Sequence, residues 1–478
     1  MKPLIDKAYD PTNFRQQGHK LVDLLADYLE STHTDSKPGV FKPFEPESLY
    51  EEWNSKLKDH SEETFEAWAR QVIGDSIHLH HPGYMGHQVS PVLPEAALAD
   101  LLSAFMNNGV GVYEMGSPTV AMERAVIKEL AGRLGFESSA DGILTSGGTL
   151  GNLTALLAAR QIKGEGDIWK EGTGNSKYAF LVSEQAHYCI DRAVKIMGWG
   201  EEGIITVPVD SRYRMDTGKL ADAYQSAQRQ NKTVLGVVGS ACSTATGSFD
   251  PLDEIADFCG EHDLWFHVDA AHGGAAAYSG KYRPLLKGIP KADSVIVDFH
   301  KMMMCPALVT GLVFKNPSSS YRTFAQKASY LWDKEEHEWF NLGKRTFECT
   351  KDMMALKVFT MLSRYGPGLF EEIVNRLFDL GKTFAAAVKK RDNFELAVEP
   401  ESNIVCFRHM PEGVSDGNSH NRAIRRKLID KGNSFIVQTE IQGKLYLRTT
   451  LMNVFTQQEH IEELLQEVEE LSDTITRK

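Results

Sequence analysis

Short apolar runs alternate with longer helical stretches between about residues 88 and 315. Each run is four or five residues long and contains few polar positions. Strands that are buried on both faces have this pattern, so it predicts a mostly parallel sheet between two layers of helices. The seven expected strands are residues 142–145, 178–182, 203–207, 234–238, 264–268, 294–297 and 311–314. In such a sheet, ligands bind beyond the carboxyl ends of the strands.

The two ends of the chain have different patterns. In residues 18–29 apolar positions recur every three or four residues, which predicts a helix whose apolar face packs on its own domain or on a partner subunit. The last hundred residues alternate helices with expected strands at 402–407 and 444–449, and Thr456 with Glu459 predicts a capping box for the closing helix. We therefore expect an N-terminal helical segment (1–87), a large α/β domain (88–375) and a small C-terminal α/β domain (376–478).

The composition is that of a globular enzyme, with 42% hydrophobic and 24% charged residues. The formal charge of −13, without a basic stripe, argues against nucleic acid or an anionic membrane as a partner. The sequence contains no long apolar run and no signal-peptide pattern at its start, so we expect a cytoplasmic location. The six cysteines are scattered without a C-x-x-C motif, which favours free buried thiols over a disulfide framework or a metal site.

A lysine and a carboxylate are expected to meet at the carboxyl edge of this sheet. Lys301 follows the strand at 294–297, and Asp269 follows the strand at 264–268. A lysine can form a Schiff base with the aldehyde of pyridoxal phosphate, and a carboxylate can keep the pyridine nitrogen protonated so that the ring accepts electrons. The pair therefore predicts an enzyme that uses this coenzyme.

A turn of small residues offers a phosphate site at the same edge. The turn follows the first expected strand, opens a helix and consists of Ser146, Gly147, Gly148 and Thr149. Small residues let backbone N–H groups approach a phosphate, and a helix N-terminus carries partial positive charge. Such a turn is often purely structural, and this one matches neither a Walker loop nor a dinucleotide fingerprint. Together with Lys301 and Asp269, it predicts a phosphate cup.

His187 follows the strand at 178–182 and is expected at the same edge. Its imidazole is a candidate to stack on the pyridine ring and to contact the substrate carboxylate. The alternative is an ordinary polar histidine in a loop.

The order of four motifs carries a family resemblance. The motifs are Ser146-Gly147-Gly148, Gln185-Ala186-His187, His267-Val268-Asp269-Ala270-Ala271 and His300-Lys301. Over roughly residues 10–470 the chain resembles the group II pyridoxal-phosphate decarboxylases, which include aromatic-amino-acid, glutamate, cysteine-sulfinate and diaminobutyrate decarboxylases. The resemblance implies a fold-type I enzyme that acts as a homodimer, with its active site at the subunit interface. It also implies α-decarboxylation of an L-amino acid to its amine.

The resemblance assigns a role to each matching residue. Lys301 would form the Schiff base, Asp269 would pair with the pyridinium nitrogen, and His187 would stack on the ring. Ala271 would touch the opposite face of the ring, and His300 would help Ser146 to Thr149 hold the phosphate.

Tyr330, 29 positions after Lys301, matches the mobile-loop tyrosine with which such decarboxylases protonate the substrate α-carbon. Family members with phenylalanine there shift toward oxidative deamination, so the tyrosine favours simple decarboxylation. The alternative is a lid aromatic that only packs.

The resemblance implies that four residues line the substrate pocket. They are His87, Gln88, Ser90 and, contributed by the second subunit, Tyr113. These segments carry no additional Arg or Lys to pair with an acidic side chain, which favours an apolar or aromatic substrate. Glutamate or 2,4-diaminobutyrate as substrate, an aldehyde synthase, aminotransferase or carbon–carbon lyase outcome, and a catalytically silent binding protein remain alternatives. Arg448 is open between a carboxylate-binding role and an ion pair at a domain interface.

Overall fold

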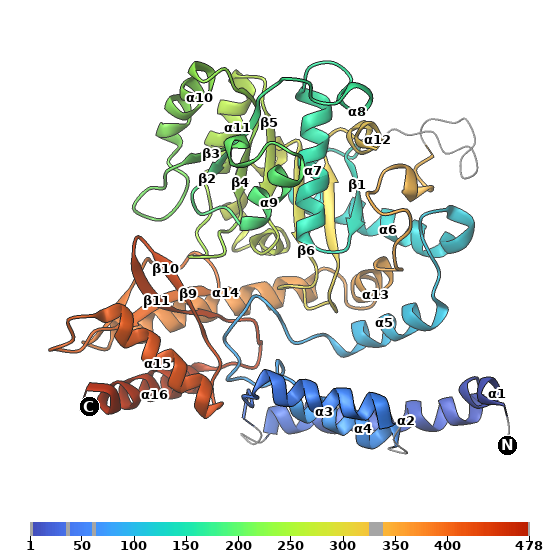
Figure 1. Ribbon diagram of the computed structural model, residues 1–478, viewed down its shortest axis with the longest axis vertical. Helices are drawn as coiled ribbons and strands as arrows, with labels where there is room; N and C mark the ends of the chain where they lie inside the picture. The colour runs from blue at the N-terminus through green and yellow to red at the C-terminus, as the bar shows by residue number, and fades with distance from the viewer. Residues whose placement is uncertain (1–2, 35–38, 60–63, 325–337, 477–478) are drawn as a thin grey trace. The chain divides into compact units, whose positions relative to one another are not determined.

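The computed structural model describes residues 3–34, 39–59, 64–324 and 338–476 (Figure 1). Contacts divide the chain into two compact units, which we describe separately. The terminal unit comprises Met1–His87, Ala386–Glu395 and Phe407–Lys478. The sheet unit comprises Gln88–Ala385 and Leu396–Cys406. The three-part division of the chain stays a prediction.

The sheet unit is built on a seven-stranded sheet in the order β1-β7-β6-β5-β4-β2-β3. Its strands are β1 (Asp141–Thr145), β2 (Tyr178–Ser183), β3 (Ile204–Val207), β4 (Thr233–Ser240), β5 (Trp265–Asp269), β6 (Ser294–Asp298) and β7 (Thr310–Phe314). β7 runs antiparallel to both of its neighbours, and the other paired strands are parallel. β1, β2, β6 and β7 are buried along their whole length. The prediction of a mostly parallel, doubly covered sheet is confirmed.

Helices cover both faces of this sheet. The α-helices are α5 (Pro94–Met106), α6 (Tyr113–Leu134), α7 (Gly148–Lys163), α8 (Ile168–Glu171), α9 (Tyr188–Ile196), α10 (Leu220–Arg229), α11 (Leu252–Glu261), α12 (Ser318–Thr323) and α13 (Ala355–Tyr365). A Cβ atom on Gly151 of α7 would touch Thr310, whereas a Cβ atom on the next strand residue, Gly311, would meet Leu130 of α6. Successive strand residues point to opposite faces, so α6 and α7 pack on opposite sides of the sheet.

Short 3₁₀-helices complete the connections in the sheet unit. They are η1 (Glu201–Gly203), η2 (Thr217–Lys219), η3 (Gly273–Tyr278), η4 (Arg283–Leu286), η5 (Ile289–Lys291) and η6 (Leu342–Lys344). The segment between β7 and α13 contains α12 and η6. Tyr330 lies outside the described residues, and its role stays a prediction.

The terminal unit combines N-terminal helices with C-terminal strands and helices. Its elements are α1 (Leu4–Ala8), α2 (Pro11–Thr34), α3 (Pro46–Asp59), α4 (Phe65–Asp75), α15 (Gly417–Lys431), β10 (Val437–Ile441), β11 (Lys444–Thr450) and α16 (Gln458–Thr476). Three further elements carry residues of both units: α14 (Gly368–Lys389), β8 (Phe394–Leu396) and β9 (Ile404–His409). The smaller sheet has the order β10-β11-β9-β8. The helix expected at 18–29 lies within α2.

The predicted capping box at the closing helix is wrong. Helix α16 begins at Gln458, and the Thr456 hydroxyl donates to the Pro82 carbonyl at 2.7 Å. The N–H of Gln457 donates to Nδ1 of His460 at 3.0 Å. The threonine is therefore used to fix the chain within the terminal unit and does not cap the helix.

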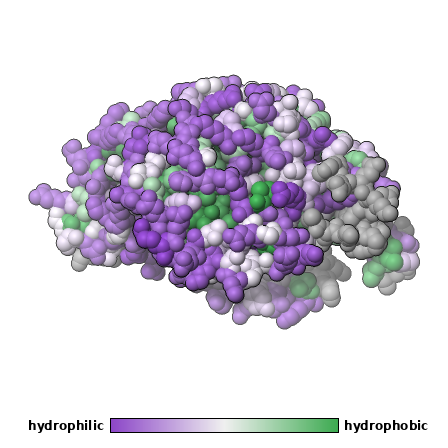
Figure 2. Space-filling view, turned by 90° about the horizontal axis from the view of Figure 1, so that it is seen from above, coloured by the Kyte–Doolittle hydropathy of each residue, from purple (hydrophilic) through white to green (hydrophobic). Residues whose placement is uncertain are grey.

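The surface visible in Figure 2 is mainly hydrophilic, with small hydrophobic areas. Each described helix is too short or too polar to cross a bilayer. Five cysteines are buried as expected, but Cys349 is exposed, which corrects the expectation for that residue. Within the described ranges, His, Cys, Asp and Glu side chains form no group of three that could hold a metal ion.

Candidate active site

A cavity of about 280 Å³ lies at the carboxyl ends of the parallel strands in the sheet unit. The segments that follow β1, β2, β4, β5 and β6 supply most of its lining. All nine residues predicted to bind the coenzyme line it: Ser146, Gly147, Gly148, Thr149, His187, Asp269, Ala271, His300 and Lys301. The topology thus brings residues from distant parts of the sequence to one place.

Lys301 pairs with a carboxylate that sequence analysis did not single out. Its Nζ lies 3.1 Å from Oδ2 of Asp298, the last residue of β6. The other oxygen of Asp298 accepts a hydrogen bond from the Thr310 hydroxyl. Burial disfavours the charged form of Lys301 and so lowers its pKa. The negative charges of Asp298 and Asp269 have the larger effect, and the pKa of Lys301 is raised. The lysine is therefore held as an ammonium ion beside Asp298.

Asp269 is oriented by a buried chain of hydrogen bonds. Asn152 donates from Nδ2 to Oδ2 of Asp269 at 2.9 Å, and the N–H of Ala271 donates to Oδ1 at 3.2 Å. Nε2 of His267 lies 2.8 Å from Oδ1 of Asn152, and its Nδ1 lies 2.8 Å from the Ser294 hydroxyl. Burial lowers the pKa of His267 to about 4. The neutral imidazole therefore donates from Nε2 to the amide oxygen and fixes the amide that holds Asp269.

The predicted phosphate cup is the N-terminus of α7. Gly147 precedes the helix with a φ of 104°, a left-handed conformation that favours glycine. Among the residues that the structure describes, no side-chain hydrogen bond caps α7, and the first N–H groups of a helix have no partners within the helix. These groups and the helix dipole suit a phosphate. The cup, the lysine and the carboxylate around one cavity fit the three anchoring points of pyridoxal phosphate.

The two predicted histidines, His187 and His300, both line the cavity. His187 precedes α9 and caps it by accepting the N–H of Cys189 on Nδ1 at 3.3 Å. Burial lowers the pKa of His187, and Asp269 opposes this shift only partly. A neutral imidazole can stack on a cationic ring without repulsion. His300 contacts the backbone of Val309 through Nδ1, 2.9 Å from the carbonyl oxygen.

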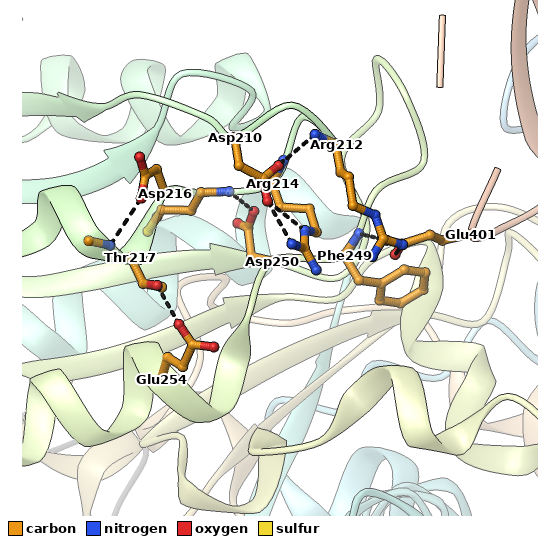
Figure 3. Close-up of polar contacts among 11 residues, drawn as sticks. Asp210, Arg212, Arg214, Asp216, Thr217, Phe249, Asp250, Glu254 and Glu401 are labelled. Atoms are coloured by element: carbon orange, nitrogen blue, oxygen red, sulfur yellow. Dashed lines mark hydrogen bonds and ion pairs between the residues drawn. The ribbon is translucent and has the colours of Figure 1, made fainter. Parts of the chain in front are cut away.

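The segment that follows β4 forms part of the cavity lining. A buried carboxylate, Asp250, anchors this segment (Figure 3). Asp250 accepts the N–H of Ser240 at 2.8 Å and that of Met215 at 2.7 Å. Burial raises the pKa of Asp250 to about 6. Nearby, Glu401 accepts the N–H of Phe249 at 2.8 Å. These bonds fix the backbone where β4 ends and the cavity lining begins.

Half of the residues that line the cavity were not predicted from the sequence. These residues are Asn152, Cys189, Ser240, Cys242, Ser243, Thr244, His272, Asp298 and Leu308. Two signals were available in the sequence. Residues 240–244 follow an expected strand at the edge where ligands bind. Asp298 lies three residues before Lys301, and Asn152 lies one helical turn after Gly148.

The predicted substrate residues stay predictions. Gln88, Ser90 and Tyr113 belong to the sheet unit and are not among the described residues that line the cavity. Ser90 is buried, whereas Tyr113 is exposed and its ring centroid lies 5.3 Å from that of Phe340. His87 belongs to the terminal unit, where it lies near Phe435 at 6.0 Å between ring centroids.

Comparisons with known proteins agree with this arrangement. The family described as pyridoxal-dependent decarboxylase conserved domain matches residues 46–410. An aromatic-L-amino-acid decarboxylase from Bacillus atrophaeus is 27% identical over 97% of this chain and 96% of its own length. An acidic amino acid decarboxylase from Xenopus tropicalis is 30% identical over 98% of this chain and 94% of its own. The crystal structure of mouse CSAD matches with a TM-score of 0.90 at 27% identity, over 97% of this chain and 99% of that one. The chain therefore belongs to the pyridoxal-dependent decarboxylase family, as a lyase whose cofactor is pyridoxal phosphate.

Proposed function

We propose that this decarboxylase removes the α-carboxylate of an L-amino acid with an apolar or aromatic side chain and releases the corresponding amine. The observation that carries the proposal is the gathering of Lys301, Asp269, His187 and the turn after β1 around one cavity. When bound, pyridoxal phosphate supplies an electron sink for the bond to the departing carboxylate.

Each side chain has a separate task in this proposal. Lys301 binds the coenzyme through its amine, and Asp269 holds a proton on the pyridine nitrogen. His187 stacks on one face of the ring, and Ala271 covers the other. Asn152 keeps the Asp269 carboxylate aimed at the ring through their 2.9 Å hydrogen bond.

The remaining residues hold the coenzyme and complete the reaction. The phosphate is bound by Ser146 to Thr149 and by His300. This binding fixes the coenzyme ring, so that the bond to the departing carboxylate can stand perpendicular to the plane of the ring. Tyr330, assigned from the sequence, returns a proton to the α-carbon as a general acid.

The substrate class rests on the charges around the cavity. An acidic side chain needs a cationic partner when it is buried. No arginine is among the described residues that line the cavity, and its lysine is assigned to the coenzyme. An acidic substrate is the second candidate, because a relative that is 30% identical is an acidic amino acid decarboxylase.

Product analysis tests this proposal. The purified enzyme is incubated with each of the twenty amino acids, with cysteine sulfinate and with 2,4-diaminobutyrate, and carbon dioxide, amine, ammonia and peroxide are measured. We expect amine and carbon dioxide in equal amounts from an apolar or aromatic amino acid, without ammonia or peroxide. Turnover of aspartate, glutamate or cysteine sulfinate alone would replace this substrate class with the acidic one.

We also propose that the enzyme is a homodimer, because α5 turns its large apolar side chains outward. Its buried residues are small: Ala96, Ala99 and Ser103. Its exposed apolar residues, each 51 to 66% accessible, are Leu98, Leu101, Leu102, Phe105 and Met106. Four of these recur at a spacing of three and four and share one helix face. A contiguous apolar face of this kind marks a protein interface.

Sedimentation tests the homodimer. The wild-type enzyme is expected to sediment as a dimer, and Leu102→Glu/Phe105→Glu as a monomer with lowered activity. If the wild-type enzyme sediments as a monomer and is fully active, the proposed homodimer is ruled out.

A further inference from the structure

We infer that the buried ion pair of Glu123 and Lys351 positions the phosphate cup by clamping the edge strand β1. The inference rests on the proposed function, because it takes the turn after β1 as the phosphate site. Lys351 Nζ lies 2.5 Å from Glu123 Oε1, and the two side chains are only 2% and 3% exposed. Desolvation offsets much of the attraction in a buried ion pair, so net stability is a poor explanation for it.

Both members of the pair bind one backbone residue, Leu144. Glu123 accepts the Leu144 N–H at 2.9 Å, and Lys351 donates to the Leu144 carbonyl oxygen at 2.6 Å. β1 is the first strand of the sheet and pairs with β7. In an antiparallel pair, every second residue turns both its N–H and its C=O away from the neighbouring strand. The ion pair therefore occupies the two groups that the edge strand leaves open at Leu144.

This clamp acts two residues before the cup begins. Ser146 follows Leu144 by two positions, and the Gly147 N–H donates to the Thr145 carbonyl at 2.9 Å in a tight turn. Pyridoxal phosphate carries its phosphate and its aldehyde on one small ring. The cup that binds the phosphate must therefore keep a fixed distance from Lys301, which follows β6 and binds the aldehyde. Fixing Leu144 fixes the point from which the cup leaves the sheet.

A second buried ion pair on the same strand provides a matched control. Arg345 Nη1 lies 2.9 Å from Oδ2 of Asp141, and the two side chains are 2% and 9% exposed. Asp141 is the first residue of β1, at the end away from the cup. Loss of this pair removes a comparable buried interaction and leaves the Leu144 clamp intact.

The test compares the affinity of the apoenzyme for pyridoxal phosphate and for pyridoxal, which lacks the phosphate. Glu123→Gln/Lys351→Met removes both charges, so no unpaired ion stays buried. We expect it to weaken pyridoxal phosphate binding by about tenfold, the equivalent of one charge-assisted hydrogen bond, and to leave pyridoxal binding unchanged. Lys351→Arg, which keeps the charge and the donors, is expected to retain the preference for the phosphate form.

The control variants separate positioning from general destabilisation. Asp141→Asn/Arg345→Met is expected to lower the melting temperature without changing the ratio of the two affinities. An unchanged ratio in Glu123→Gln/Lys351→Met would overturn the inference. If that variant does not fold, Lys351→Met alone, which removes the donor to the Leu144 carbonyl, is compared in the same way, and an unchanged ratio there would also overturn the inference.

A cup variant distinguishes failure of this inference from failure of the proposed function. Ser146→Ala/Thr149→Val is expected to lower the preference for the phosphate form. No change in that variant would remove the cup assignment itself. A lowered preference in Ser146→Ala/Thr149→Val, together with an unchanged ratio in Glu123→Gln/Lys351→Met, would rule out only the inference about the clamp.

Discussion

Nδ2 of Asn152 donates a hydrogen bond to Oδ2 of Asp269 at 2.9 Å, while Oδ1 of the same amide lies 2.8 Å from Nε2 of His267. The asparagine therefore links a buried neutral histidine to the carboxylate assigned to the coenzyme ring. Because an amide offers one donor end and one acceptor end, the histidine decides which end faces Asp269.

Asn152→Asp is predicted to lower kcat by roughly tenfold or more, the equivalent of one lost hydrogen bond to a charged group. The new carboxylate removes the donor and lies beside Asp269, where two negative charges oppose each other. Steady-state kinetics and the visible spectrum of the bound coenzyme check this. Cys189→Ala, which removes the other acceptor of the same amide, is the control and should have a much smaller effect. A kcat equal to that of the wild type in Asn152→Asp would contradict the role of Asn152.

Acid is predicted to destabilise the enzyme through His267. Its folded-state pKa is about 4, below the ordinary value of 6.5, so the unfolded chain binds a proton where the folded chain does not. The free energy of unfolding therefore falls as the pH drops from about 6.5 to about 4, by up to about 3 kcal/mol from this residue. Denaturant unfolding of the wild type and of His267→Gln at several pH values measures this contribution to the free energy of unfolding. If the free energy of unfolding depends on pH with the same slope in the two proteins, His267 is excluded as the source of the destabilisation by acid.

Asp298→Asn is predicted to shift coenzyme uptake to lower pH. The carboxylate of Asp298, 3.1 Å from Lys301 Nζ, helps to raise the pKa of that lysine, and only the neutral amine attacks an aldehyde. Removing the charge should lower the pKa of Lys301, so that the uptake rate rises at a lower pH than in the wild type. Stopped-flow absorbance of apoenzyme mixed with pyridoxal phosphate gives the profile. Thr310→Val, which leaves the carboxylate in place, serves as the control, and an unshifted Asp298→Asn profile would refute the prediction.

Much of this architecture could be predicted because the strands carry an unambiguous signal. Runs such as Val295 to Val297 are apolar without alternation, and the residues that follow them meet at one edge by the topology of a parallel sheet. The missed contacts have a different origin. Asn152 acts through Asp269, which is 117 positions away in the sequence, and Thr456 gives up a cap for the carbonyl of Pro82, which is 374 positions away. A local pattern contains no information about such partners.

Tyr330→Phe is predicted to keep coenzyme binding and to lose clean amine production, because the ring would remain and the proton donor would be absent. Tyr330 lies outside the described residues, so this prediction depends on the sequence alone. Amine, ammonia and peroxide formed per molecule of carbon dioxide are the quantities to measure. Amine turnover at the wild-type rate would show that another group supplies the proton.

Every role proposed for the cavity requires that Lys301 carries the coenzyme. Borohydride reduction of the enzyme loaded with pyridoxal phosphate, followed by proteolysis and mass spectrometry, locates the lysine to which the coenzyme is attached. We expect the reduced adduct on the peptide that contains Lys301, and we expect both the adduct and the visible absorbance band to be lost in Lys301→Ala. An adduct on a different lysine, or a wild-type spectrum in Lys301→Ala, would contradict it.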